Sequence, residues 1–121
     1  MENLKNPLPE RLLTFAANVV KLTDKLVSTP SSKHIANQLM RCATSAGANY
    51  EEACNAESRS DFVHKMQVAL KESQEALYWL RLLKKADLIP DRSQDYDNLL
   101  GEAQAINKIL AKSVITAKKA K

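Results

Sequence analysis

Apolar or small residues recur at alternating steps of four and three between residues 59 and 86, and neither glycine nor proline interrupts them. The series consists of Phe62, Met66, Ala69, Ser73, Ala76, Leu80 and Leu83. This spacing places all its members on one face of an α-helix, because side chains three and four positions apart are neighbours there. A strand would instead require a period of two. The segment therefore predicts a long helix with one buried face.

Three further segments show the same helical spacing. They run from about Pro9 to Ser28, from Pro30 to about Ala56, and from just after Ser93 through Ala117. Thr29, Ser58 and Ser93 are residue types that cap helix N-termini, and Thr29 is followed by a proline at the first helical position. Short connections make consecutive helices antiparallel neighbours. We predict an all-α fold, in which residues 1–121 form a single antiparallel up-down-up-down four-helix bundle.

The overall composition agrees with long helices, since only two of the 121 residues are glycine and four are proline. The sequence contains no run of 18 apolar residues, the length needed to span a membrane. The N-terminal sequence lacks the basic and apolar regions of a signal peptide. We therefore expect a cytoplasmic protein without a membrane partner.

The two cysteines, Cys42 and Cys54, fall on the same expected helix. Twelve residues of helix separate them by about 18 Å, which is too far for a disulfide. We expect both to be reduced and packed as small hydrophobic residues.

The chain lacks the motifs of a metal or catalytic site. A di-metal bundle needs two Glu-x-x-His motifs, but the sequence offers only Asp61-Phe62-Val63-His64 at a helix start. Neither cysteine has a histidine at a local spacing, and two glycines are too few for a phosphate-binding loop. We predict no catalytic residue, no cofactor, no metal and no enzyme activity.

A stripe of small residues on the second helix carries polar groups within it. Ser45, Asn49 and Glu52 are spaced four and three apart along one edge, and Glu72 lies at the edge of the core face of the third helix. We expect these four residues to meet in a polar network that sets helix register. The alternative is a small-ligand pocket or a carboxylate pair for acid–base chemistry. Gly47 in this stripe predicts close approach of another helix, because a mid-helix glycine otherwise costs about 1 kcal/mol.

The net charge is +4, and its cations are concentrated in two clusters. After Asn107 the chain has five lysines and no acidic residue, and a second cluster lies near the end of the third helix. The candidate nucleic-acid contacts are Arg81, Lys84, Lys85, Lys108, Lys112, Lys118, Lys119 and Lys121. The alternative interpretation is that these lysines solvate helix ends and favour the helix dipole.

The apolar faces of the first three helices are broader than a narrow helix–helix seam requires. On the first helix, Leu13, Ala17, Val20 and Val27 form a second stripe beside the core series. A globular core would account for part of this breadth. The remainder predicts a symmetric contact between copies of the chain.

The run from Ser45 to Ala53, SAGANYEEA, resembles the Ser-Ile-x-x-Asn-Ile-Ala-Glu-Gly signature of four helix bundle proteins, also called 23S ribosomal RNA intervening-sequence proteins. Ser45, Asn49 and Glu52 match the signature, whereas Tyr50 and Ala53 replace an isoleucine and a glycine. The resemblance continues through Ser-Asp-Phe at residues 60–62 and through ALKESQEALYWL at residues 69–80.

This resemblance implies a homo-oligomer, specifically a ring of five bundles. A related branch contains the accessory proteins of diversity-generating retroelements, which bind a reverse transcriptase and nucleic acid through a basic surface. The resemblance thus implies RNA or a nucleic-acid-associated protein as partner. Three functions remain open at this point: a nucleic-acid-associated oligomer, which we favour, a protein-interaction scaffold that binds no nucleic acid, and a small-ligand or enzymatic bundle.

Overall fold

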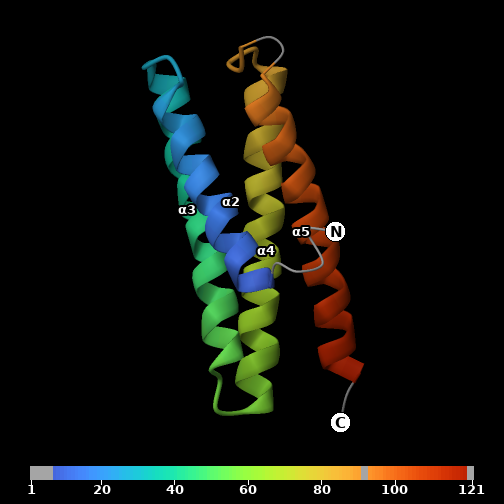
Figure 1. Ribbon diagram of the computed structural model, residues 1–121. Coiled ribbons are helices and arrows are strands. Elements are labelled where there is room, and N and C mark those ends of the chain that lie inside the picture. Colours follow the sequence, from blue (N-terminus) through green and yellow to red (C-terminus); the bar gives the residue numbers. More distant parts are fainter. Residues whose placement is uncertain (1–6, 91–92, 120–121) are drawn as a thin grey trace.

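The computed structural model of the chain describes residues 7–90 and 93–119. Within these ranges it contains four helices and no strand: α2 (Leu8–Asp24), α3 (Pro30–Cys54), α4 (Arg59–Lys85) and α5 (Gln94–Lys119). Consecutive helices run in opposite directions (Figure 1). Each helix packs against two others, so that α3 and α5 each lie between α2 and α4. The predicted all-α four-helix bundle is confirmed.

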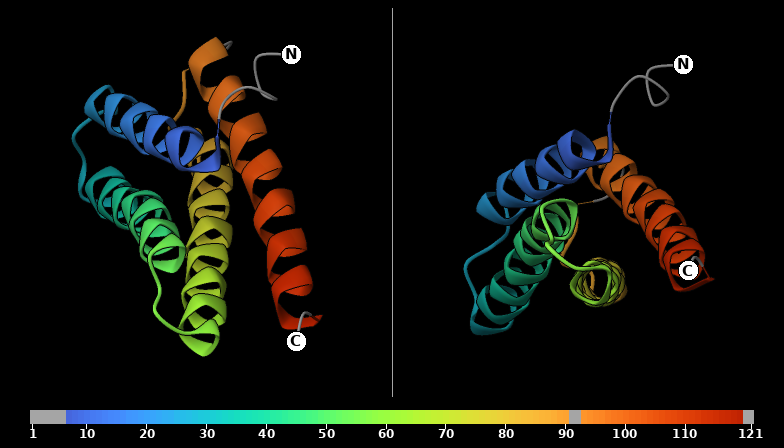
Figure 2. Two further views of the ribbon diagram at one scale, coloured as in Figure 1. Left: turned by 60° about the horizontal axis from the view of Figure 1, so that its bottom comes forward. Right: turned by 90° about the horizontal axis from the view of Figure 1, so that it is seen from below.

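The four helices differ in length, and the bundle is therefore uneven along its axis. α2 has 17 residues, whereas α3, α4 and α5 have 25, 27 and 26. At 1.5 Å per residue, α2 is roughly 13 Å shorter than its neighbours. It covers one end of the bundle and leaves the end near the α3–α4 turn to the other helices (Figure 1). There α4 lies between α3 and the C-terminal end of α5 (Figure 2).

The starts of α3, α4 and α5 are capped as the sequence predicts. The hydroxyls of Thr29, Ser58 and Ser93 accept hydrogen bonds from backbone N–H groups three residues ahead, at 3.2, 3.0 and 3.2 Å. Each bond satisfies a donor that the first helical turn would otherwise leave unpaired. These local contacts fix where α3, α4 and α5 begin.

α2 ends one turn earlier than the predicted end at Ser28. The backbone N–H of Lys25 donates to the Leu22 carbonyl at 3.0 Å, and that of Leu26 donates to Thr23 at 3.2 Å. These three-residue bonds tighten and close the last turn. Beyond them the chain becomes extended, as the residue before a proline must, and Val27 is left exposed.

α4 is followed, after its C-cap Ala86, by a left-handed residue, Asp87, whose φ is 59°. The Leu88 N–H then reaches back to the Leu83 carbonyl at 2.9 Å, and the Asp87 N–H reaches back to Lys84 at 3.1 Å. This pattern pairs carbonyls that the helix end would otherwise leave free. It turns the chain toward α5 without a glycine.

The core consists of the predicted apolar faces with one shift in α5. In α4, six of the seven members of the predicted series are buried, and Phe62, the first member, is half-buried. The buried members are Met66, Ala69, Ser73, Ala76, Leu80 and Leu83. In α5, the four-three spacing of Tyr96, Leu99, Ala103, Ile106 and Leu110 predicts Ser113 as the next core position, but Val114 is buried instead. The Ser113 hydroxyl donates to the Ile109 carbonyl within the helix. None of the helices in the described ranges is long and apolar enough to cross a membrane.

Two polar contacts fix the position of α5 along the axis of α4. The buried Tyr96 hydroxyl donates to the Leu80 carbonyl at 2.7 Å. The Ser73 hydroxyl donates to the Asn107 side-chain carbonyl. Because buried polar groups are costly when unpaired, these bonds favour one register of the two antiparallel helices over others.

Candidate functional site

The four residues expected to form one polar network are divided among three separate contacts. The Asn49 amide donates to the backbone carbonyl and hydroxyl of Ser45, at 2.9 and 3.0 Å, within α3. Glu52 instead accepts a hydrogen bond from Lys65 of α4 at 2.6 Å, and Glu72 accepts one from Arg41 at 3.1 Å. Among the described residues, no hydrogen bond links Asn49 to either glutamate.

Arg41 of α3 is the residue that organises the contact with the α4 carboxylates. Its guanidinium donates to Glu72 at 3.1 Å and to Glu75 at 2.9 Å. The Trp79 indole N–H also donates to Glu75, at 3.1 Å. The indole bond, aided by Cys42 and Arg41, holds the pKa of Glu75 below its usual value. Glu75 therefore remains ionised and ties α3 to α4.

Cys42 and Cys54, expected to be packed alike, differ in exposure. Cys42 is fully buried, whereas Cys54 is exposed. Burial, followed by the hydrogen bond to Glu75, raises the pKa of Cys42 to about 12. The thiol accordingly stays protonated near neutral pH. Both cysteines are free, as the sequence predicts.

One group in the described part of the chain has the geometry to offer three ligands to a metal. The Cys42 sulfur and a carboxylate oxygen each from Glu72 and Glu75 lie within 4.8 Å of one another. The Arg41 guanidinium, however, donates to all three side chains. A cation would have to displace this fixed positive charge and deprotonate a buried thiol. The group is better suited to an interhelical ion-pair contact than to a metal centre.

Gly47 lies in a close contact between α3 and α2. A Cβ atom at this position would be 3.6 Å from the Leu12 Cβ and 3.9 Å from the Leu12 carbonyl oxygen. Those are ordinary van der Waals distances, so the contact has room for a methyl group and for little more. The close approach expected of the small-residue stripe is thus made within the chain.

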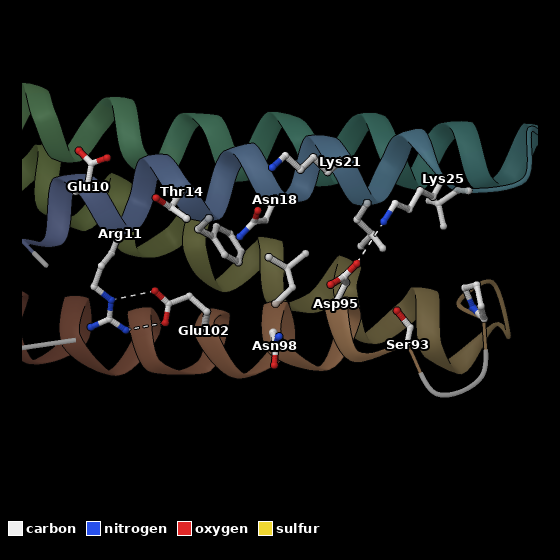
Figure 3. Close-up of a pocket in the computed structure, with 15 residues that line it drawn as sticks. Glu10, Arg11, Thr14, Asn18, Lys21, Lys25, Ser93, Asp95, Asn98 and Glu102 are labelled. Carbon is white, nitrogen blue, oxygen red and sulfur yellow. Dashed lines mark hydrogen bonds and ion pairs between the residues drawn. The ribbon is translucent and has the colours of Figure 1, made fainter. Parts of the chain in front are cut away.

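A groove of about 640 Å³ separates α2 from α5 (Figure 3). The Arg11 guanidinium bridges it with two hydrogen bonds to Glu102, at 2.9 and 2.7 Å. Lys25 crosses its other end to reach Asp95 at 3.2 Å. These ion pairs link the α2 side of the groove to α5. The groove is not the small-ligand pocket expected from the sequence, since neither Asn49, Glu52 nor Glu72 lines it.

The cations near the end of α4 belong to a longer exposed series, which we call the α4 outer stripe. It consists of Lys71, Gln74, Tyr78, Arg81 and Lys85, all exposed, at steps of three and four on the face opposite the core. The stripe contains no acidic residue. Lys84, also predicted as a contact, lies beside it with its ammonium 5.8 Å from the centre of the Tyr96 ring.

The lysines of α5 form a second exposed series, the α5 outer stripe. It consists of Gln104, Lys108, Lys112, Ile115 and Lys119, again without an acidic residue. Lys118 is exposed beside it and borders a shallow depression that also includes His64. The Ser73–Asn107 bond places Lys71 and Lys108 at similar levels on neighbouring helices. Lys121 lies outside the described residues.

Three aromatic side chains come together where sequence reasoning had placed no site. The rings of Tyr78 and Trp79 meet edge to face, with centroids 5.1 Å apart and an angle of 79° between planes. His34 of α3 meets Trp79 in the same manner, at 5.8 Å and 86°. The adjacent pair Tyr78-Trp79 was visible in the sequence, but the contact with His34 depends on how α3 packs on α4.

Comparison with known proteins identifies the family. The family model described as "23S rRNA-intervening sequence protein" matches residues 9–112. A crystal structure of a protein of unknown function from the S23 ribosomal protein family of Bacteroides thetaiotaomicron is 35% identical and superposes with a TM-score of 0.79. The match covers 89% of this chain and 98% of that one. No curated protein matches the chain. Because the family model spans α2 to α4 and most of α5, the chain belongs to the 23S rRNA-intervening sequence protein family.

Proposed function

We propose that this protein is a small, non-catalytic, homo-oligomeric bundle that binds the phosphate backbone of RNA through the outer stripes of α4 and α5. The observation that carries the proposal is the absence of acidic residues from both stripes. In the described part of the chain, the six cations of the stripes take part in no ion pair, whereas five carboxylates elsewhere do. The six are Lys71, Arg81, Lys85, Lys108, Lys112 and Lys119.

The chemistry of the stripes favours backbone contacts over base readout. Lysine is a flexible point charge that suits phosphate oxygens, whereas bidentate recognition of base edges calls for arginine, asparagine or glutamine. Five of the six cations are lysines. Each phosphate that a cation neutralises releases counterions, so affinity should fall steeply with salt.

An exposed apolar surface on α2 supports self-association. Leu13 is 61% exposed and Val20 is 40% exposed, and the exposed Ala17 lies between them on the same side of the helix. Copies joined in this way would present several basic surfaces at once, which strengthens binding without new contacts. The ring of five is the assembly that the family resemblance implies, and light scattering of the purified protein would measure it directly.

The proposal is tested by measuring fluorescence anisotropy of a labelled RNA duplex at about 50 and 200 mM KCl. The triple variant Lys108→Gln, Lys112→Gln, Lys119→Gln should bind more weakly and show a salt slope smaller by about three. The control changes Lys21, Lys25 and Lys65 to Gln, which removes the same charge from other faces. Because Lys25 and Lys65 pair with Asp95 and Glu52, circular dichroism first establishes that this control is folded. Equal losses from both variants, or wild-type binding that does not respond to salt, would contradict backbone binding through the stripe.

The exposed apolar residues of α2 also favour a second candidate, a scaffold that assembles and docks a protein without nucleic acid. Under this alternative, the triple lysine variant would keep its oligomeric mass and its partner. Wild-type protein would show no measurable affinity for the duplex even at low salt. The same anisotropy experiment therefore separates the two functions.

A further inference from the structure

The aromatic cluster of His34, Tyr78 and Trp79 lies at the α4 outer stripe. Binding of the RNA phosphate backbone to the cations of the stripe does not require these aromatic rings. Tyr78 is 56% exposed and occupies the middle position of the stripe, with Lys71 seven residues before it and Lys85 seven residues after it. A large aromatic ring on a solvated helix face is not needed for the core. Its position among cations points to a ligand that combines a flat apolar surface with negative charge.

The cluster is held in one arrangement by contacts on both helices. The Trp79 indole N–H is fixed by Glu75 at 3.1 Å, and Glu75 is in turn held by Arg41. Tyr78 and His34 each meet Trp79 edge to face. Because no parallel ring among the described residues covers Tyr78, a flat ligand could stack against the exposed side of its ring.

The charges around the cluster favour an anionic ligand. Arg81 follows Tyr78 by one helical turn, and the exposed Lys33 precedes His34. The nearest acidic side chains along α4, Glu72 and Glu75, are both paired with Arg41, which balances one of their two charges, and Lys33, Lys71 and Arg81 outweigh the other. The surface around Tyr78 thus carries unpaired positive charge and paired negative charge.

We propose that Tyr78, supported by Trp79 and His34, is a stacking platform for an unpaired base of a single-stranded nucleic acid, whose phosphates lie along Lys71, Arg81 and Lys85. This inference rests on the proposed function and narrows the ligand from RNA in general to single-stranded nucleic acid. Sites for single strands combine a basic track with aromatic side chains on which bases stack. In a duplex the bases are stacked on each other and would reach only the cations. Single-stranded RNA should therefore bind more tightly than a duplex of the same length.

A cluster of tyrosine, tryptophan and arginine can also be the centre of a protein–protein interface. Lysine is depleted at such interfaces relative to the rest of the protein surface. The neighbours of Tyr78 along the stripe are instead Lys71, Gln74, Arg81 and Lys85. The charge pattern favours nucleic acid, and a change in oligomeric mass on mutation would reveal the protein interface.

The experiment uses the intrinsic fluorescence of Trp79, because it is the only tryptophan in the chain. The full-length protein is titrated with an oligouridine of about 12 nucleotides, a length within the usual site size for single strands, and with an RNA duplex of equal length. The single strand should quench the Trp79 emission as it binds. The duplex should bind, as anisotropy of a labelled strand reports, and leave that emission nearly unchanged.

Three variants separate stacking from charge. Tyr78→Ala should weaken single-strand binding roughly tenfold while leaving duplex binding unchanged. Tyr78→Phe keeps the ring and should bind like wild type. Val27→Ala is the matched control, since it truncates another exposed apolar side chain, 71% exposed, away from the stripe. Tyr78 is largely exposed, so the fold should survive its truncation.

The outcomes distinguish this inference from the function on which it rests. If neither RNA binds at low salt, the proposed function itself fails. If both RNAs bind with equal affinity, Trp79 is not quenched and Tyr78→Ala binds like wild type, backbone binding stands and the stacking platform is overturned. A Tyr78→Ala variant that loses oligomeric mass but not single-strand affinity would likewise overturn it and assign the cluster to a protein contact.

Discussion

Two groups of polar side chains in this bundle use similar residue types in opposite ways. Between the helices, most polar side chains have a fixed partner: Arg41 binds Glu72 and Glu75, and Tyr96 binds the Leu80 carbonyl, whereas the buried Ser32 hydroxyl is an exception. On the outer stripes of α4 and α5, the cations take part in no ion pair within the described ranges. The first group is satisfied by the protein itself. The second group leaves its charge available to a partner.

This contrast explains why residue type alone is a poor guide to function in a helical bundle. Tyr96 and Tyr78 are both on long helices, yet the first is buried with its hydroxyl bonded and the second is 56% exposed. Changes between the helices should alter stability and spare RNA binding. Changes on the outer stripes should do the reverse.

Gly47→Leu should destabilise the protein by roughly 3 kcal/mol, because the longer side chain must displace Leu12 from the contact between α2 and α3. Gly47→Ala is the matched control, since a Cβ at 3.6 Å from Leu12 makes an ordinary contact. That variant should gain up to about 1 kcal/mol from helix propensity. Urea unfolding followed by circular dichroism measures both. A Leu variant as stable as wild type would show that the contact is looser than the distances indicate.

Cys42 should make stability fall at alkaline pH. Burial raises the pKa of its thiol from 9.0 to about 12, so above pH 9 the unfolded chain releases this proton while the folded chain retains it. The contribution is intact below pH 9 and is lost as pH rises toward 12, by roughly 1–3 kcal/mol at about pH 10 to 11.

Cys42→Ala removes this titration and leaves every other group in place. Urea midpoints measured at about pH 8 and pH 10.5 should therefore fall more for wild type than for the variant. The exposed Cys54 provides the control, because Cys54→Ala should keep the contribution of Cys42 and lower only the pKa of Tyr50, which burial and the Cys54 thiol raise. Identical pH dependence in wild type and Cys42→Ala would contradict a raised thiol pKa.

The helices themselves were predictable from sequence because their determinants are local. The four-three spacing of α4 and the caps Ser58 and Ser93 depend on residues within a few positions of each other. The contacts between helices were not predictable in the same way. Arg41 reaches Glu75 across 34 residues of sequence, and which residues face each other there depends on the turn and tilt between α3 and α4.

The polar network illustrates this limit. Spacing correctly placed Ser45, Asn49 and Glu52 along an edge of α3, but it could not reveal that Lys65 and Arg41 would bind the two glutamates. Periodicity also could not decide between Ser113 and Val114, since positions three and four residues after Leu110 lie on either side of it, at about 60° and 40° around the helix. The aromatic cluster was not predicted for the same reason, because the contact between His34 and Trp79 depends on how α3 packs on α4.

Tyr96→Phe should cost about 1 kcal/mol, because it removes the buried hydroxyl that donates to the Leu80 carbonyl at 2.7 Å. The ring and its contact with Lys84 are retained. Tyr78→Phe makes the same chemical change on the outer stripe, where solvent replaces the lost hydroxyl contact, and should leave the unfolding midpoint unchanged. Equal losses of stability from both variants would remove the distinction between the two groups of polar residues.

Lys108→Gln should have the smallest effect on folding and a measurable effect on RNA binding. Its side chain is exposed on the α5 outer stripe, and surface substitutions of this kind leave stability nearly unchanged. The salt slope of duplex binding should fall by about one, since one phosphate contact is lost. Lys21→Gln on α2 removes the same charge and should leave the slope unaltered. If Lys108→Gln shifted the thermal midpoint and kept the wild-type slope, Lys108 would belong with the residues that hold the bundle together, and the α5 stripe would lose a member.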